Sequence, residues 1–160
     1  MSTSEASNKT EQGGDIVRLI VSEHNEVKEL FDKYLLSKNA SEQEKIVKKI
    51  IHDLLVHETA EEEVVYPKLK SFPTGQEIAD SRIEEEKQAE TKLKELQKMK
   101  ADDPNFSSTV EEIIRAVTEH SMEEEKQVLP LLREHLDVEQ REEMGQKFME
   151  VHNRASSEIS

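Results

Sequence analysis

The chain contains the same short pattern twice, beginning at His57 and again at His120. In each copy the histidine is followed by two glutamates that begin four positions later, by a valine eight positions later and by a proline ten positions later. Positions i and i+4 of a helix lie on one face, one turn apart. His57 with Glu61, and His120 with Glu124, can therefore each present a nitrogen and a carboxylate to one point. This spacing predicts facing helices whose inward-pointing donors form a metal site.

Composition favours one highly charged helical domain. Among 160 residues, 36% are charged, 34% are hydrophobic, and only four are glycine and four proline. This profile suits a helical bundle that is large enough to bury a core. The net charge of −14 argues against nucleic-acid or anionic-membrane partners, which need a basic surface. Because the chain has no cysteine, any metal must be held by nitrogen and oxygen donors.

Apolar residues recur at spacings of three and four, as in amphipathic helices. This periodicity predicts four long helices that cover about 15–37, 41–70, 75–100 and 108–135. It also predicts a short fifth helix that ends near Phe148 and packs over one end of the bundle. Capping-box patterns mark several of the expected helix starts, at Ser41–Glu44, Thr74–Glu77, Ser108–Glu111 and Asp137–Gln140. The sequence therefore predicts an all-α protein, an antiparallel up-and-down four-helix bundle with a short extra C-terminal helix.

The two ends of the chain lack this periodicity. We expect residues 1–13 to form a disordered tail, residues 14–153 to form the bundle, and residues 154–160 to form a second disordered tail. No apolar run approaches the roughly 18 residues of a membrane span, and the N-terminus lacks the apolar core of a signal peptide. We therefore expect a cytoplasmic protein with no membrane partner.

Both His-x3-Glu pairs fall on the apolar seams of the predicted second and fourth helices. A histidine four positions before a glutamate is often only a surface pair. Ionised carboxylates, however, almost never face a core unless they are paired or bound to metal. Metal binding is therefore the stronger interpretation of these pairs. His24 lies in the inward stripe of the first helix, where it is either a hydrogen-bonded core histidine or a further ligand.

The spacing of these residues repeats along the chain. His57 and His120 are 63 residues apart, and His24 and Glu86 are 62 residues apart. Glu86 occupies a seam position of the third predicted helix where an apolar residue is expected. Each half of the chain is thus a helix pair whose first helix offers one donor and whose second offers two, which suits two metal ions side by side.

The segment Ser22–Phe31, together with the two His-x3-Glu-Glu motifs and their prolines, resembles the hemerythrin-like (HHE cation-binding) family over about residues 15–136. The resemblance implies a non-heme di-iron centre, two iron ions joined by an oxo or hydroxo bridge and by bridging glutamates. The positions that match the family's ligands are His24, His57, Glu61, His120 and Glu124.

The third helix departs from the family pattern. Where the family usually has Glu-His, this chain has Glu85-Glu86, and its third helix contains no histidine. Leu93 lies seven residues after Glu86, as Phe31 lies seven after His24, so Glu86 is our predicted sixth ligand. Glu90 is an alternative donor, and a third helix without any ligand is a further possibility.

A set of three histidines and three glutamates favours iron or manganese, since zinc prefers four ligands. The choice among iron, manganese and zinc stays open at this point. We predict that the remaining histidines are surface residues, namely His52, His135 and His152. We also predict that the flanking glutamates are solvated, namely Glu58, Glu62, Glu123 and Glu125. Of these, Glu58 is close enough to rotate towards the site.

The resemblance implies a protein that handles or reduces dioxygen, peroxide or nitric oxide at a di-iron centre. These small molecules are its expected ligands, and nucleic acid is not. The alternative is a non-catalytic iron or oxygen sensor, or a metal-buffering protein. Catalytic activity is left open, because no substrate pocket can be derived from the sequence.

Overall fold

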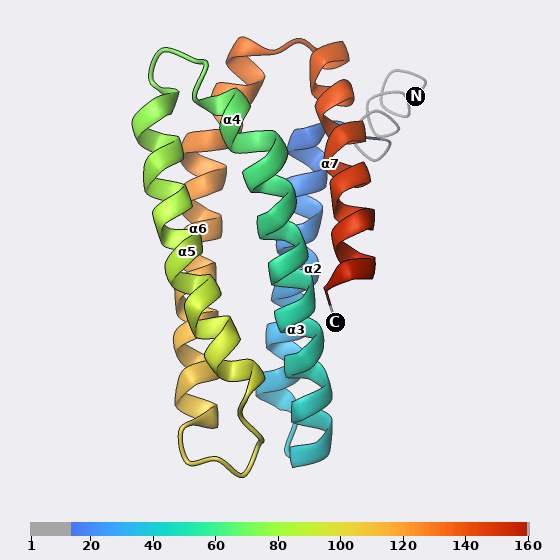
Figure 1. The fold of residues 1–160 in the computed structure, drawn as a ribbon, viewed down its shortest axis with the longest axis vertical. Helices are drawn as coiled ribbons and strands as arrows, with labels where there is room; N and C mark the ends of the chain where they lie inside the picture. Colours follow the sequence, from blue (N-terminus) through green and yellow to red (C-terminus); the bar gives the residue numbers. More distant parts are fainter. Residues whose placement is uncertain (1–13, 160) are drawn as a thin grey trace.

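Four long helical segments form an antiparallel bundle, and a fifth helix packs against one side of it (Figure 1). The computed structural model describes residues 14–159, and the predicted tail 1–13 lies outside the described residues. The elements in chain order are α2 (Ile16–Leu36), α3 (Ala40–Ala60), the π-helix η1 (Glu61–Val65), α4 (Tyr66–Leu69), α5 (Gly75–Gln97), α6 (Phe106–His135) and α7 (Val138–Glu158). Because α3, η1 and α4 follow one another without a break, they form the predicted second helix. The all-α four-helix architecture is confirmed.

Only one of the expected capping boxes forms. The Asp137 side chain accepts a hydrogen bond from the backbone N–H of Gln140, whose own side chain accepts one from the backbone of Asp137. At α3 the capping residue is Asn39 instead of Ser41, because the Asn39 side chain accepts a 3.0 Å hydrogen bond from the N–H three residues later. Thr74 precedes α5 without a side-chain cap, and α6 begins two residues before Ser108. Local capping patterns therefore placed these helix starts only approximately.

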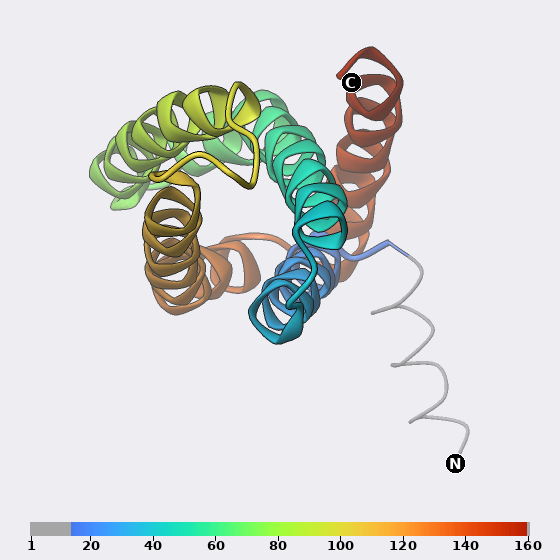
Figure 2. The same cartoon turned by 90° about the horizontal axis from the view of Figure 1, so that it is seen from below.

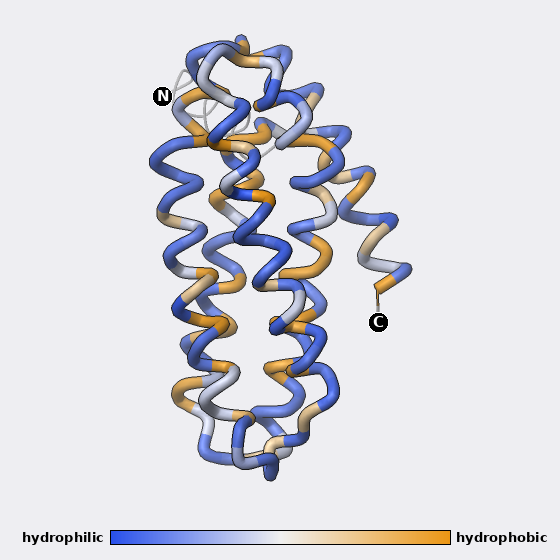
Figure 3. The backbone as a smooth tube through the Cα atoms, turned by 60° about the vertical axis from the view of Figure 1, so that its left-hand side comes forward, coloured by the Kyte–Doolittle hydropathy of each residue, from blue (hydrophilic) through white to orange (hydrophobic). Residues whose placement is uncertain are grey.

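The buried side chains form two apolar clusters along the bundle axis. The upper core in the orientation of Figure 1 includes Ile20, Leu69, Leu132 and Phe148. The lower core includes Leu30, Ile50, Leu96 and Ile113. Burying each such side chain stabilises the fold by roughly 1.5–3 kcal/mol. Apolar and polar residues are interspersed along the helices (Figure 3). No helix between residues 14 and 159 is both long and apolar enough to serve as a membrane span.

Helix α7 differs from the predicted fifth helix in length and position. It has 21 residues and ends at Glu158, so it includes residues 154–158, which were expected to form a disordered tail. It lies beside α2 and α3, outside the square of the four bundle helices, and does not cover an end (Figure 2). Arg141 fixes it to the start of α2 through a 2.9 Å ion pair with Asp15. A Cβ atom at Gly145 would collide with the carbonyl oxygen of Gly14, so glycine is needed at this contact.

Candidate metal centre

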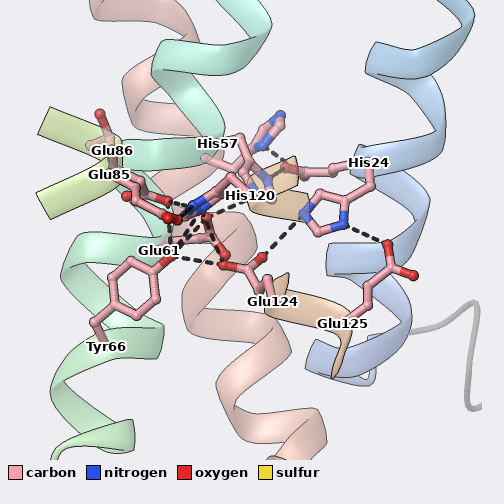
Figure 4. Close-up of polar contacts among 12 residues, drawn as sticks. His24, His57, Glu61, Tyr66, Glu85, Glu86, His120, Glu124 and Glu125 are labelled. Atoms are coloured by element: carbon pink, nitrogen blue, oxygen red, sulfur yellow. Dashed lines mark hydrogen bonds and ion pairs between the residues drawn. The ribbon is translucent and has the colours of Figure 1, made fainter. Parts of the chain in front are cut away.

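A layer of histidines and glutamates lies between the two apolar cores. It contains all six predicted ligands, His24 from α2, His57 from α3, Glu61 from η1, Glu86 from α5, and His120 and Glu124 from α6 (Figure 4). The side chains form two groups in which one candidate ligand atom per residue lies within 4.8 Å of the others. One group is His24, His57 and Glu124, and the other is Glu61, Glu86, His120 and Glu124. Glu124 therefore belongs to both groups.

The three histidines have the same orientation relative to this layer. In each, Nε2 faces a buried carboxylate of the layer, at 3.1 Å for His24 and Glu124, 3.1 Å for His57 and Glu61, and 3.3 Å for His120 and Glu86. In each, Nδ1 lies close to a carboxylate outside the layer, at 2.8 Å for His24 and Glu125, 2.7 Å for His57 and Glu23, and 2.9 Å for His120 and Glu85. A carboxylate that accepts from Nδ1–H fixes the tautomer in which Nε2 is free to bind a metal.

The three glutamates of the layer are almost completely buried. Glu61 and Glu124 have an exposed fraction of 0%, and Glu86 has 1%. Three carboxylates in one buried layer repel one another, and burial also opposes their ionisation. Such residues are found in protein interiors mainly when they are paired or bound to a cation.

Several polar atoms of the layer have no hydrogen-bond partner among the described residues. They are Nε2 of His24 and of His57, and one oxygen of each of Glu61, Glu86 and Glu124. Leaving such an atom buried without a partner costs about 1–3 kcal/mol. Because these imidazole nitrogens and carboxylate oxygens converge on one layer, the residues present fit bound cations.

The pKa values of the layer reflect the competition between burial and charge. Burial and the neighbouring carboxylates of Glu124 and Glu86 raise the pKa of Glu61 well above its usual range. Burial also opposes ionisation of Glu124, but its close contacts with Glu61 and His24 outweigh burial and lower the pKa of Glu124. Without a cation, the layer therefore favours a protonated Glu61 beside an ionised Glu124. A bound cation would replace this proton and let both carboxylates ionise.

Tyr66 was missed by the sequence analysis. Its side chain is fully buried, and its hydroxyl lies 2.7 Å from Oε2 of Glu124 and 2.9 Å from Oε2 of Glu86. The π-helical turn brings it there, because the N–H of Tyr66 bonds to the carbonyl of Glu61, five residues earlier. In a regular α-helix a residue five positions on lies about 140° around the axis. The sequence offers one hint of its role. Tyr66 occupies a position of the repeat at which the second copy has the apolar Leu129, so the hydroxyl is a difference between the two copies.

His152 was also misjudged. It was predicted to be a surface residue, but it lies on α7 and contacts Glu23, with 3.0 Å between its Nδ1 and Oε2 of Glu23. Burial raises the pKa of Glu23, but hydrogen bonds with His152 and His57 outweigh burial and lower this pKa to about 2. Glu23 is therefore an ionised link between α7 and the candidate ligand His57.

The remaining histidines and the glutamates near the site do not belong to either group of candidate ligands. Glu90 forms a 2.9 Å ion pair with Lys94 and is not in either ligand group. His52 lies near Ser156 Oγ, and the exposed His135 stacks on Phe72, so neither joins the layer. The expectation that Glu58 is solvated is wrong. Its exposed fraction is 7%, and burial together with the charge of Glu86 raises its pKa well above the usual range.

The comparisons with known proteins agree with this arrangement. Residues 15–132 match the model of the hemerythrin HHE cation-binding domain. An uncharacterized hemerythrin-like protein of Schizosaccharomyces pombe is 30% identical over 115 residues, which cover 67% of this chain and 57% of that protein. A protein of Nostoc sp. named DNA nickase is 28% identical over 134 residues, which cover 84% of this chain and 37% of that protein.

The chain spans only part of each of these relatives, and no solved structure matches it. The family match nevertheless covers most of the chain and includes α2 and nearly all of α6, and therefore all six residues of the buried layer. The chain belongs to the hemerythrin HHE cation-binding family.

Proposed function

We propose that the chain binds two iron ions in the buried layer and uses them to handle or reduce dioxygen, peroxide or nitric oxide. The observation that carries the proposal is the convergence of buried histidine nitrogens and carboxylate oxygens that have no hydrogen-bond partner. Two ligand groups that share Glu124 support two ions instead of one. Mixed imidazole and carboxylate donors in these numbers favour iron over zinc.

The residues have distinct roles in this proposal. His24, His57 and Glu124 would hold one ion, and Glu61, Glu86, His120 and Glu124 would hold the other, so Glu124 would contribute to both groups. The carboxylates that contact Nδ1 of the three histidines would keep Nε2 directed at the ions. The iron pair would supply electrons to the small molecule. The apolar cores above and below would keep water away from the two axial sides of the site.

An absorption experiment tests this proposal. The protein is loaded anaerobically with ferrous iron, and its spectrum is recorded before and after addition of hydrogen peroxide, and separately with azide after oxidation. A di-iron centre should develop ligand-to-metal charge-transfer bands on oxidation and change them with azide. The Glu86→Gln variant should lose iron or shift these bands, and Glu90→Gln, one turn along the same helix, should do neither. A spectrum that peroxide and azide leave unchanged would contradict the proposal.

One observation favours the sensing alternative. Helix α7 contacts the site through His152 and Glu23, and the ring of Phe148 lies edge-on to His57 at 5.9 Å. A change of metal occupancy that moves His57 would therefore act directly on α7. Proteolysis or hydrogen exchange of α7 with and without iron distinguishes the two functions. A sensor should expose α7 in one state, and an α7 equally protected in both states argues against sensing.

The name of the Nostoc relative raises DNA cleavage as a further activity. This chain spans 37% of that protein, so the activity of the whole relative does not transfer to it. The net charge of −14 opposes DNA, whose backbone is bound mainly by lysine and arginine. We propose that this chain does not act on DNA.

A further inference from the structure

A cavity of about 210 Å³ lies beside the buried layer, inside the bundle. Part of its wall belongs to the layer, namely His24, His57, Glu86 and His120. Other parts of the wall are apolar, with Val27, Leu54 and Val117 of the lower core among them. This inner cavity therefore has one side that carries the proposed metal centre and other sides that suit a hydrocarbon group.

The volume of the inner cavity exceeds what a diatomic gas needs. One water molecule takes up about 30 Å³ in the liquid, and an apolar cavity of about 150 Å³ holds benzene. Dioxygen and nitric oxide are closer in size to water. At about 210 Å³, the cavity has room for a compact organic group in addition to the reacting atoms.

The cavity opens to solvent between α5 and α6. Its lining includes the exposed residues Gln88 on α5 and Ala116 and Glu119 on α6. Lys92 also lines it and forms a 2.6 Å ion pair with Glu112 across the two helices. The rim is therefore polar while the interior is largely apolar. This rim is where a small molecule with an apolar body would enter.

Glu58 supplies a polar group inside the cavity. It lines the cavity and is 7% exposed, and its Oε2 has no hydrogen-bond partner among the described residues. A carboxyl oxygen can accept a hydrogen bond whether or not the group is ionised. Such a group, next to apolar walls and the proposed metal centre, suits a ligand with one hydroxyl donor and one apolar end.

We propose that the substrate is an organic hydroperoxide, ROOH, with a compact apolar group R. The inference rests on the proposed di-iron function. R packs against Val27, Leu54 and Val117, and the terminal O–H donates to Glu58. The reaction breaks the O–O bond and gives ROH and water, with consumption of two protons and two electrons. The di-iron pair held by the layer would supply the two electrons on going from the diferrous to the diferric state, and an external one-electron reductant would return the pair to the diferrous state for the next turnover.

The first test measures binding without redox chemistry. Benzene and tert-butyl hydroperoxide are titrated separately into zinc-loaded protein, and the methyl NMR signals of Val27, Leu54 and Val117 are followed. Both ligands should shift these signals. Val117→Phe, which fills the cavity, should remove the shifts of Val27 and Leu54, and Val138→Phe, the same change at an exposed residue of α7, should not. Shifts that are absent in the wild type, or unchanged in Val117→Phe, would overturn the inference.

The second test compares substrates in the iron-loaded protein. Val117→Phe should lower kcat/KM for tert-butyl hydroperoxide by about tenfold or more relative to hydrogen peroxide, as expected for loss of a hydrophobic pocket. Equal losses for both substrates would overturn the organic substrate while leaving peroxide reduction intact. Inactivity of the wild type towards both peroxides would instead overturn the proposed function on which the inference rests.

Glu58→Leu separates the polar contact from the apolar one. In zinc-loaded protein it should weaken tert-butyl hydroperoxide binding by about tenfold, the usual scale of one hydrogen bond, and leave benzene binding intact or stronger. Equal affinity of wild type and Glu58→Leu for the hydroperoxide would refute the role of Glu58.

Discussion

The hydroxyl of Tyr66 donates a 2.7 Å hydrogen bond to Oε2 of Glu124, the carboxylate that belongs to both candidate ligand groups. The two residues come from opposite halves of the chain, Tyr66 from the start of α4 and Glu124 from α6. The contact depends on the π-helical turn, which adds one residue to the turn between Glu61 and Tyr66. Such turns often occur at functional sites. Tyr66 therefore holds the shared carboxylate in place.

Replacing Tyr66 by phenylalanine should weaken metal binding. The change keeps the buried ring but removes the donor that fixes Glu124, and loss of such a supporting hydrogen bond typically costs 10–100-fold, so we expect about that loss of iron affinity. Tyr34→Phe is the matched control, because Tyr34 is also buried but lies in the lower core. Anaerobic competition with a ferrous chelator measures both. Equal affinities of Tyr66→Phe and wild type would show that Tyr66 does not support the site.

The pH dependence of stability should reveal the ion pairs of His120. Burial lowers the pKa of His120, but its hydrogen bond with Glu86 and the charges of Glu124 and Glu86 outweigh burial and raise the pKa from 6.5 to about 9. This interaction stabilises the fold fully below pH 6.5 and is lost as the pH rises through 9. The free energy of unfolding of chelator-treated protein should therefore fall, by on the order of 3 kcal/mol, across this window.

Urea unfolding at a series of pH values measures this decline. The raised pKa of Glu61 acts in the same direction, because a proton bound in the folded state is lost at higher pH. Metal-loaded protein should not show the decline, since the ions take the place of the protons. His120→Gln should reduce it. Chelator-treated wild type whose stability is constant or rises between pH 6.5 and 9 would contradict the assigned ion pairs.

The sequence was sufficient to predict that the six candidate ligands lie close together. All six follow a regular helical spacing of apolar residues that holds up to the site. Glu86 illustrates this, since a charged residue at a seam position could only be buried with partners, and it is 1% exposed. That these residues bind metal stays a prediction. The sequence was less informative beyond the site. For example, the capping boxes predicted at Ser41, Thr74 and Ser108 do not form.

The misses have physical causes. Tyr66 could not be placed, because a π-helical turn changes the helical phase and no local propensity marks it. The environments of Glu58 and His152 depend on neighbouring helices, which the sequence pattern does not show. Glu58 lines the inner cavity, and His152 meets Glu23 across the α2–α7 contact. The length of α7 was underestimated, because its mostly polar sequence leaves few buried positions, Met144, Gly145, Phe148 and Ala155.

Glu86 should make the iron pair hard to return to the ferrous state. A carboxylate in place of an imidazole adds one negative charge to a buried site, and at an effective dielectric constant of about 20 such a charge is worth several kcal/mol. Negative charge favours Fe(III), so we predict rapid autoxidation and no reversible oxygen carriage. The protein is reduced anaerobically, exposed to air and then evacuated, and its spectrum should remain diferric.

Two variants show whether Glu86 is the cause. Glu86→His should slow autoxidation by about tenfold or more, equivalent to about 1.4 kcal/mol in the barrier. Glu90→His, one turn along α5 and outside the ligand groups, should leave the rate unchanged. Repeated recovery of the diferrous spectrum by the wild type under vacuum would refute this prediction.

DNA cleavage should be absent. Iron-loaded protein incubated with supercoiled plasmid and a reductant should produce no more nicked circles than the His57→Ala, His120→Ala double variant, which lacks the proposed site. This follows from the charge of −14, which repels the DNA backbone. Nicking that requires both histidines would show that the chain shares the activity named for its Nostoc relative.

The number of iron ions per chain tests the buried metal centre most directly. Elemental analysis of anaerobically loaded, desalted protein should give about two irons for the wild type and for His52→Ala, whose histidine lies near Ser156 outside the layer. His57→Ala and His120→Ala should each fall to about one iron or fewer, because each removes one ligand from the buried layer. If the wild type binds no iron, or if His52→Ala loses as much iron as His120→Ala, the buried layer is not the metal centre.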